Sequence, residues 1–483
     1  MANLTSVLHI SEQRRGILTV LADGRTYFQN VASIDEKSSA VDAFVAEQMR
    51  EFHIPGLSLV VVRDGKIIKA QGYGLANIEL NAKVTPDTVY EIGSVTKQFT
   101  STALMLLVED EKVKLDDALS VYLTEIPTAW KPITVRQLLN QTSGIKDYFD
   151  DNEPGFLEAA HYPADKERIL KPAVSAPLNY APGESYNYSN TNHYLLGLII
   201  EKASGRTYAD FMRERIFTPL GMTATRVNDH KIIIKNRAAG YGYDWGANVL
   251  QNADYVDSTW AFAAGALVST VYDLAKWDIA LDTEKLIRSS SKKEMWTAGK
   301  LNSGAAHRYG FGWYVDLVNG HTNLSHGGDI PGFATYYSRY PDDRLTVIMS
   351  MNQYIYPKRI SDKIAAMYLP ELIFRAIDDK DPDFTALVQK LYGNLAAGKL
   401  DLWEEKLFTP GLWKSLKASF GDADNIDFYK RLGAPKSVTL VERIEDERGL
   451  LTRYRASYGR NARLIKFVRN RAGLITEWED YEE

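Results

Sequence analysis

The sequence LSLVVVRDGKIIKA, residues 57–70, decides the fold because it predicts an antiparallel β-hairpin. Two β-branched and aliphatic runs, Leu57 to Arg63 and Lys66 to Ala70, are separated only by Asp64-Gly65. An Asp-Gly pair is typical of a type I′ turn, in which both central residues need positive φ. The chain therefore begins an antiparallel sheet here.

Helical patterns lie on both sides of this hairpin in the sequence. Apolar residues from Val41 to Phe52 recur at i, i+3, i+4 and i+8, which indicates an amphipathic helix. The run Phe99 to Val108 is apolar on nearly every side, which indicates a helix buried all round. Further helices are predicted at 193–203, 208–217 and 360–368, and a core strand at 345–351. These elements predict an α/β/α sandwich with an antiparallel sheet, plus a helical subdomain.

The length of 483 residues allows about three domains at roughly 150 residues each. We expect an N-terminal extension at residues 1–33, in which two short strands between Gly16 and Asn30 meet at Asp23-Gly24, and a catalytic domain at residues 34–377. The acidic stretch Asp378–Asp383 is the best linker candidate. Beyond it, helical pieces and four strand-like runs predict a small α+β accessory domain at residues 384–483.

Composition excludes several classes of protein. Lys and Arg number 57 against 62 Asp and Glu, a net charge of −5, which disfavours nucleic acid as a partner. The chain has no cysteine, so disulfides, thiol nucleophiles and Cys-ligated zinc are excluded. The longest apolar run, Trp260–Val268, is far shorter than the roughly 20 residues of a membrane span. No signal peptide follows Arg14-Arg15, so we expect a soluble protein, cytoplasmic by default.

Ser94-Val95-Thr96-Lys97 is the strongest candidate for catalysis. The chain contains no G-x-S-x-G elbow, H-E-x-x-H helix, P-loop or G-x-G-x-x-G motif. A Ser and a Lys three residues apart share one helix face, so the amine can take the hydroxyl proton. Gly93 lets the backbone turn sharply before the apolar helix, whose dipole would stabilise an oxyanion and whose surroundings would lower the pKa of Lys97.

The same Ser–Lys spacing occurs at three other places, Ser143/Lys146, Ser289/Lys292 and Ser290/Lys293. The first pair spans the predicted end of a helix at Gly144, and the other two lie in a polar run that predicts a solvated helix start. For Ser94 and Lys97 the alternative interpretation is an N-cap serine with a surface lysine.

Tyr188-Ser189-Asn190 is the second candidate element. A tyrosine has a pKa of about 10, so beside a lysine ammonium it can exist partly as phenolate and act as a general base. The amide of Asn190 can hold a substrate carbonyl. The pattern is repeated at Tyr392-Gly393-Asn394, and a polar loop is the alternative interpretation of Tyr188.

His326-Gly327-Gly328 is the third element and the only H-x-G of the chain. Its glycines would let a strand edge pass close to a substrate acyl group, and the N–H of Asp329 would be a second oxyanion donor beside that of Ser94. A simple turn is the alternative interpretation.

The order and spacing of these three elements resemble the serine β-lactamase and penicillin-binding-protein superfamily. The class C-like branch, with its family VIII carboxylesterases and D-aminopeptidases, is the most similar. The flanking segments that also look like this branch are 56–62, 138–144, Pro182-Gly183 and 309–313. The resemblance covers about residues 35–375 and implies a β-lactamase/transpeptidase-like fold.

The resemblance implies a serine acyl hydrolase in which Ser94 is the nucleophile and Lys97 and Tyr188 share the proton transfers. The substrate-binding residues would be Asn190, His326, Gly328 and Asp329. No metal or cofactor is implied.

Two departures from the family pattern bear on the substrate. The S-D-N triplet is missing, and His326 stands where true β-lactamases have the lysine of K-T-G. A histidine is mostly neutral at pH 7, so it anchors a penicillin carboxylate less well than a lysine would. We therefore expect a carboxylesterase or a D-amino-acid-specific peptidase or amidase acting on a small ester or peptide. The alternatives are a β-lactamase or DD-peptidase and a non-catalytic acyl-binding sensor, and the C-terminal domain is a candidate surface for homo-oligomerisation.

Overall fold

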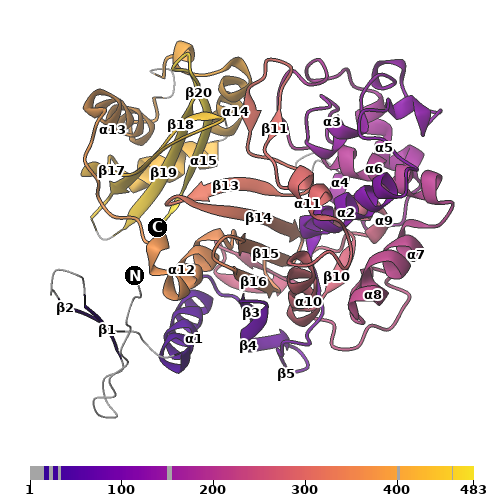
Figure 1. The fold of residues 1–483 in the computed structure, drawn as a ribbon, viewed down its shortest axis with the longest axis horizontal. Coiled ribbons are helices and arrows are strands. Elements are labelled where there is room, and N and C mark those ends of the chain that lie inside the picture. Colours follow the sequence, from indigo (N-terminus) through magenta and orange to yellow (C-terminus); the bar gives the residue numbers. More distant parts are fainter. Residues whose placement is uncertain are drawn as a thin grey trace.

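A seven-stranded antiparallel sheet is the centre of the computed structural model, which describes residues 16–20, 26–30, 34–149, 155–399, 403–421, 423–459 and 461–483. In spatial order the strands are β13 (Tyr314–Val318), β14 (His321–Ile330), β15 (Phe333–Tyr340), β16 (Leu345–Met351), β3 (Gly56–Arg63), β4 (Lys66–Asn77) and β5 (Ala82–Lys83). Figure 1 shows this sheet crossing the molecule. The predicted hairpin forms β3 and β4, and its turn residues Asp64 and Gly65 have φ of 51° and 69°.

Helices cover both faces of the sheet, which confirms the predicted α/β/α sandwich. The side chains of β3 alternate between two cores, as those of a strand must. Leu59 and Val61 pack with α1 (Ile34–Glu51) and α12 (Lys358–Tyr368), whereas Val60 and Val62 belong to the core of the opposite face. On that face α10 (Val271–Leu281) lies against β3 and β16. Because both faces are covered, the strand is buried at almost every residue.

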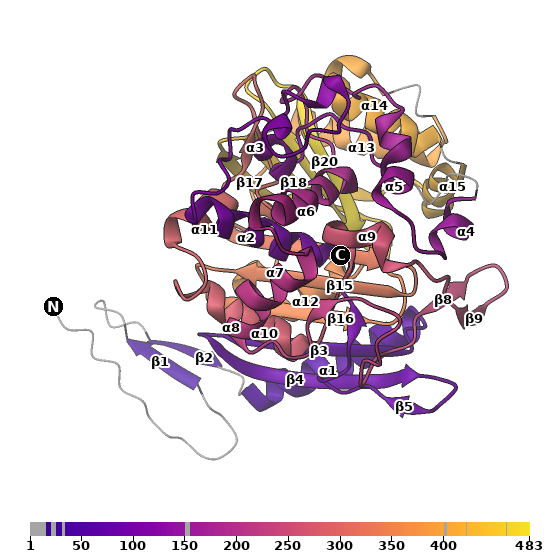
Figure 2. The ribbon, with the colours of Figure 1, turned by 90° about the vertical axis from the view of Figure 1, so that its right-hand side faces the viewer.

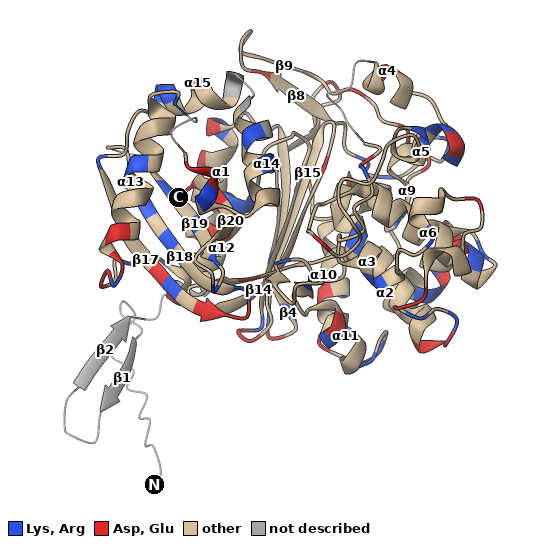
Figure 3. Cartoon of the chain, turned by 90° about the horizontal axis from the view of Figure 1, so that it is seen from above, with Lys and Arg blue, Asp and Glu red and all other residues tan. Residues whose placement is uncertain are grey.

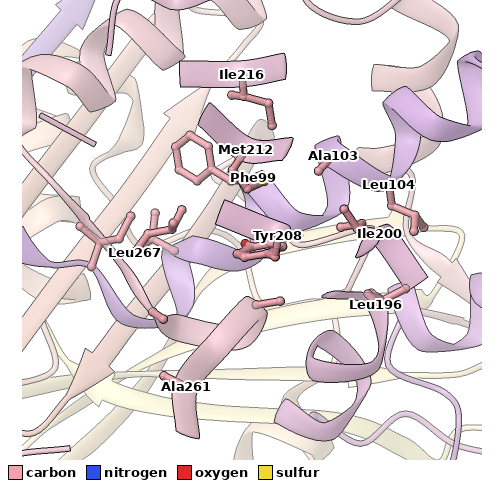
Figure 4. Packing of buried hydrophobic residues seen from close by; sticks show 14 of the residues in the cluster. Phe99, Ala103, Leu104, Leu196, Ile200, Tyr208, Met212, Ile216, Ala261 and Leu267 are labelled. Atoms are coloured by element: carbon pink, nitrogen blue, oxygen red, sulfur yellow. The ribbon is translucent and has the colours of Figure 1, made fainter. Parts of the chain in front are cut away.

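The helical region beside the sheet is built around α2 (Thr96–Glu109), the predicted all-round buried helix. It packs against α6 (Asn190–Ser204), α7 (Tyr208–Met212) and α9 (Ser258–Gly265). Figure 4 shows Phe99, Ala103 and Leu104 of α2 among the apolar side chains of these neighbours. The helix predicted at 208–217 instead widens into a π-helical turn at Arg213–Phe217, which joins α8 (Thr218–Leu220).

Shorter elements surround this region. The helices are α3 (Val135–Leu139), α4 (Phe156–Ala160), α5 (Lys166–Val174) and α11 (Ser289–Met295). The paired strands are β6 (Tyr90–Glu91), β10 (Leu267–Ser269) and β7 (Arg226–Val227), then β8 (Tyr241–Asp244) with β9 (Val249–Asn252), and β11 (Gly299–Lys300) with β12 (Ala306–His307). Thr134 and Gln137 form a capping box at α3, which ends well before Gly144.

The C-terminal region forms a second sheet, as predicted, with strands β17 (Ser437–Asp446), β18 (Gly449–Ser457), β19 (Ala462–Arg469) and β20 (Ile475–Glu482). Helices α13 (Pro382–Ala396), α14 (Pro410–Gly421) and α15 (Ala423–Leu432) lie beside it (Figure 2). One sheet face shares a core with these helices, and the other contributes Val441, Leu464 and Tyr481 to the core around α12. The exact domain boundaries remain predictions.

The N-terminal strands β1 (Gly16–Val20) and β2 (Thr26–Asn30) pair antiparallel, and the predicted turn at Asp23-Gly24 lies outside the described residues. Among the helices that the structure describes, none has both the length and the apolar character needed to cross a bilayer.

A buried ion-pair cluster joins α10 to the sheet. Asp278 accepts hydrogen bonds from Tyr337, from Thr346 and from Arg339, which lies 2.6 Å away. Removing one partner of a buried pair leaves the other charge uncompensated, which costs about 3–5 kcal/mol. We therefore expect Asp278→Ala to lower the free energy of unfolding by about that amount in urea denaturation. Asp165→Ala at the exposed N-cap of α5 is the control; a loss no larger than this control shows would contradict the prediction.

Candidate active site

Ser94 and Lys97 lie where the chain turns from β6 into α2. Ser94 belongs to a short 3-10 turn at Gly93–Val95, and α2 follows directly at Thr96. Lys97 is fully buried, and its Nζ lies 2.9 Å from the Ser94 Oγ. The predicted Ser–Lys contact at the start of the buried helix is therefore present.

Two carbonyl oxygens complete the surroundings of the Lys97 amine. Its Nζ donates to Asn190 Oδ1 at 2.8 Å and to the backbone oxygen of Ala264 at 2.8 Å. A neutral lysine amine has two N–H groups and one lone pair. The two carbonyl oxygens match the N–H groups, and the lone pair then faces the Ser94 hydroxyl.

The Ala264 oxygen reaches Lys97 because α9 is broken at Phe262. Phe262 has φ of 36° and ψ of −129°, outside the helical region, and its ring packs against Tyr194 and Tyr208. A non-glycine residue in such a conformation costs of order 1–3 kcal/mol and persists only where the surroundings hold it. No signal in the apolar run 260–268 predicts this break.

Burial lowers the pKa of Lys97 to about 7, against the opposing effect of two carboxyl groups, Asp147 and Asp329. Burial in turn raises the pKa of Asp147, and it raises that of Asp329 to about 7. Asp147 Oδ2 accepts from Asn190 Nδ2 at 3.0 Å. Asn190 therefore links Asp147 to Lys97 and uses its amide oxygen within the protein, where the sequence predicts a substrate carbonyl contact.

Tyr188 lies next to both groups, with its ring centroid 4.7 Å from Lys97 Nζ and its hydroxyl hydrogen-bonded to Ser94. Burial and the nearby Tyr314 raise the pKa of Tyr188 well above its ordinary value. The predicted partial phenolate is therefore wrong, because burial disfavours the anion and Lys97 carries no permanent charge to stabilise it. Tyr188 is a neutral phenol.

Gln141 holds the turn that carries Tyr188 and Asn190. Its Oε1 accepts a hydrogen bond from the backbone N–H of Ser189 at 2.9 Å, and its backbone oxygen accepts one from the backbone N–H of Asn187. This residue lies in the 138–144 flank, but its positioning contacts are not predictable from the sequence.

His326 lies on β14 with both ring nitrogens engaged inside the protein. Nδ1 lies 2.6 Å from the Gly327 oxygen, and Nε2 lies 2.9 Å from the Tyr309 hydroxyl. Since a carbonyl only accepts, Nδ1 carries the proton and Nε2 accepts from Tyr309. Burial and Lys97 lower the pKa of His326 to about 3, so the ring is neutral.

The backbones around Ser94 and Gly328 touch. A Cβ on Gly328 would lie 2.0 Å from the Ile92 oxygen and 2.9 Å from the Ser94 nitrogen, and one on Gly93 would lie 2.6 Å from the Asp329 nitrogen. Glycine is therefore required at both positions. This contact brings the N–H groups of Ser94 and Asp329, the two predicted oxyanion donors, into one neighbourhood.

A cavity of about 230 Å³ opens at Ser94, and we call it the Ser94 cavity. Tyr188, His326 and Asp329 line its near side. Its far side holds residues that no sequence motif indicated, among them Arg308, Tyr314, Lys358, Arg453 and Glu479. Within the described residues, no cluster of three or more His, Asp or Glu side chains is arranged to hold a metal ion.

The other Ser–Lys pairs lack such surroundings. Ser143 is buried and donates to Asn192. Lys292, predicted to be solvated, is instead buried and caps the carbonyl oxygens of Leu281 and Thr283. Tyr392 of the second Tyr-x-Asn donates to Asp480 in the C-terminal region.

Comparison with known proteins identifies the relatives of this chain. The Beta-lactamase family model matches residues 41–368. The chain is 31% identical over 323 residues to Penicillin-binding protein 4* of Bacillus subtilis (strain 168), covering 64% of this chain and 70% of that protein. The structure of D-amino acid amidase from Ochrobactrum anthropi SV3 is 25% identical with a TM-score of 0.60, covering 70% of this chain and 98% of the amidase.

The match to the octameric penicillin-binding protein homologue from Pyrococcus abyssi extends over 92% of this chain and 96% of that one. Its TM-score is 0.61 at 22% identity, so it bears on the fold alone. The family model spans the Ser94, Tyr188 and His326 elements together. This chain therefore belongs to the β-lactamase and penicillin-binding-protein family of serine hydrolases.

Proposed function

We propose that the protein hydrolyses small esters or D-amino-acid amides and peptides through an acyl-enzyme on Ser94. The observation that carries this proposal is the environment of Lys97, whose two carbonyl acceptors leave the lone pair of the neutral amine facing Ser94 Oγ. Such a lysine is a general base near neutral pH. In this scheme Asn190 is a positioning residue, because it holds Lys97.

In the acylation step the Ser94 hydroxyl gives its proton to Lys97 while Oγ attacks the substrate carbonyl. The N–H groups of Ser94 and Asp329 stabilise the oxyanion. The C–O or C–N bond then breaks, and the leaving group takes a proton from the Tyr188 hydroxyl, which Lys97 replenishes. Water repeats the sequence on the acyl-enzyme, so that the acid is released and Ser94 is restored.

The amidase relative supports the amide branch of the proposal, and the penicillin-binding relative keeps β-lactamase activity as the second candidate. The neutral His326 supplies no fixed charge for a penicillin carboxylate, which favours the first. A panel of 4-nitrophenyl butyrate, D- and L-alanine 4-nitroanilide and nitrocefin distinguishes the branches. Labelling by a fluorophosphonate without turnover of any of them would favour the acyl-binding sensor instead.

The pH dependence tests the base. Because Lys97 acts in its neutral form and its pKa is about 7, we expect kcat/KM to rise as pH increases through about 7 and then to level off. Asp329 titrates in the same range, with a pKa of about 7. Asp147→Asn and Asp329→Asn each remove a carboxylate that raises the Lys97 pKa.

Both variants should therefore shift the rising limb to lower pH. If the rise of kcat/KM with pH vanishes in Asp329→Asn, the titrating group is Asp329. If the rise stays at the same pH in both variants, Lys97 is not the base.

We also propose that the chain forms a homo-oligomer through its C-terminal domain. The proposal starts from a likeness of fold alone: the Pyrococcus abyssi homologue, whose fold matches over 92% of this chain, is octameric. The molar mass of the full chain by light scattering tests this; a value of 54.4 kDa at all concentrations would contradict it.

A further inference from the structure

The far side of the Ser94 cavity is formed in part by the C-terminal sheet. Glu479 lies on β20 and Arg453 on β18, yet both line the same cavity as Ser94. Alternation along β20 explains this. Glu477, Glu479 and Tyr481 face the catalytic sheet, whereas Trp478 and Asp480 face the C-terminal helices.

Glu479 forms an ion pair with Arg308 of the catalytic part, with 3.3 Å between Oε2 and NH1. The same carboxylate lies 3.2 Å from Lys466 Nζ, its cross-strand neighbour on β19. Burial acts to raise the pKa of Glu479, but Lys466, Arg308 and Lys358 outweigh it and hold the pKa below its usual range. Glu479 is therefore a fixed negative charge that is shared between two cations. Figure 3 shows acidic and basic residues along this sheet.

Arg308 is the most exposed of the three cations that line this wall. Its side chain is 28% exposed, and among the described residues Glu479 is the one acid within ion-pair distance. Its guanidinium carbon lies 4.9 Å from the centroid of the Tyr314 ring, which also packs at 5.2 Å from His326. By contrast, Lys358 is paired with Asp362 at 2.6 Å, and Arg453 with Glu442 at 2.5 Å.

The near side of the cavity offers no permanent cation, and it carries the carboxyl group of Asp329, whose pKa is about 7. Lys97 has a pKa of about 7 and His326 one of about 3, so neither is a permanent cation. A guanidinium carries five donors in a rigid fork that matches a carboxylate, and it stays charged at every working pH. An apolar acyl tail that reached this wall would remove water from the Arg308 guanidinium without replacing the hydrogen bonds to that water.

We propose that Arg308, in the far wall of the Ser94 cavity and paired there with Glu479 of β20, binds a carboxylate of the substrate. The C-terminal sheet thereby takes part in substrate selection. This inference rests on the proposed function. The carboxylate belongs either to the acyl group or to the leaving group, and the experiment separates the two.

Two matched substrate pairs carry the test. Mono-4-nitrophenyl adipate and 4-nitrophenyl hexanoate differ by a carboxylate at the end of the acyl chain. D-Alanyl-D-alanine and D-alanyl-D-alaninamide differ by a carboxylate on the leaving group. For each pair, the ratio of kcat/KM for the charged to the neutral member is the carboxylate preference.

In Arg308→Met we expect this preference to fall about tenfold or more in one pair, mainly through KM, because a charge-assisted hydrogen bond is lost. The carboxylate preference of Arg308→Lys should lie between that of the wild-type protein and that of Arg308→Met. Glu479→Gln keeps a hydrogen-bond acceptor but removes a negative charge, so the preference should rise. Arg455→Met is the matched control, since Arg455 is 26% exposed and paired with Glu483 but does not line the cavity.

A carboxylate preference that falls in Arg308→Met and rises in Glu479→Gln would support the proposal. An unchanged preference in Arg308→Met, or one that falls in Glu479→Gln, would overturn it. If Glu479→Gln does not fold, Glu477→Gln replaces it, because Glu477 also acts on Arg308 electrostatically. A wild-type protein that cleaves none of the four substrates contradicts the proposed function instead, whereas turnover with unchanged ratios contradicts only this inference.

Discussion

Replacing Ser94 with alanine should reduce ester hydrolysis by about 10³-fold or more and abolish labelling by a fluorophosphonate. The reason is that Ser94 Oγ is the hydroxyl that lies 2.9 Å from the buried Lys97 amine. Without it, the oxyanion donors and the cavity remain, but no covalent intermediate can form. Rates with 4-nitrophenyl butyrate and the mass of the labelled protein give the measurement.

Ser289→Ala and Ser290→Ala are the matched controls for this substitution, since each serine stands three residues before a lysine. Both lie exposed at the start of α11. They should leave rate and labelling unchanged. If Ser94→Ala still takes up the probe, the nucleophile has been assigned wrongly.

Lys97→Ala and Tyr188→Phe should each cost almost as much as the two together, because both act on the proton of Ser94. Residues that act as one unit give strongly non-additive losses. If each single substitution lowers kcat/KM by about 10³-fold, the double variant should lower kcat/KM by about the same factor rather than by the product of the two. A double-mutant cycle on kcat/KM measures the coupling.

Tyr392→Phe and Lys293→Ala supply the controls for this cycle. Tyr392 belongs to the second Tyr-x-Asn but donates to Asp480 and does not line the Ser94 cavity, and Lys293 is exposed on α11. Losses that simply multiply in Lys97→Ala/Tyr188→Phe would mean that the two groups act independently, and the shared proton path would be ruled out.

Features set by neighbours in the sequence were predictable. The Asp64-Gly65 turn needs only its own backbone conformation, and the Ser94–Lys97 contact needs only one helical turn. The protonation of Tyr188 was not predictable, because it depends on burial by residues far along the chain. The same holds for the Ala264 oxygen, which reaches Lys97 only through the broken helix at Phe262.

The far wall of the cavity could not be predicted from the sequence either. The runs that form β17 to β20 are recognisable as strands, and their alternation separates two faces. Which face meets another part of the protein depends on packing between regions. Glu479 therefore carries no signal in the sequence that would connect it with Ser94.

The position of Glu479 on the last strand has a consequence for biosynthesis. A ribosome adds roughly 5–20 residues per second, so tens of seconds separate the synthesis of Ser94 from that of β20. During this interval Ser94 can fold beside Lys97 while Arg308 still lacks its partner Glu479. A nascent chain in this state would hold Ser94 beside Lys97 together with an Arg308 that no carboxylate balances, and the docking of β20 would set the carboxylate preference of the finished protein.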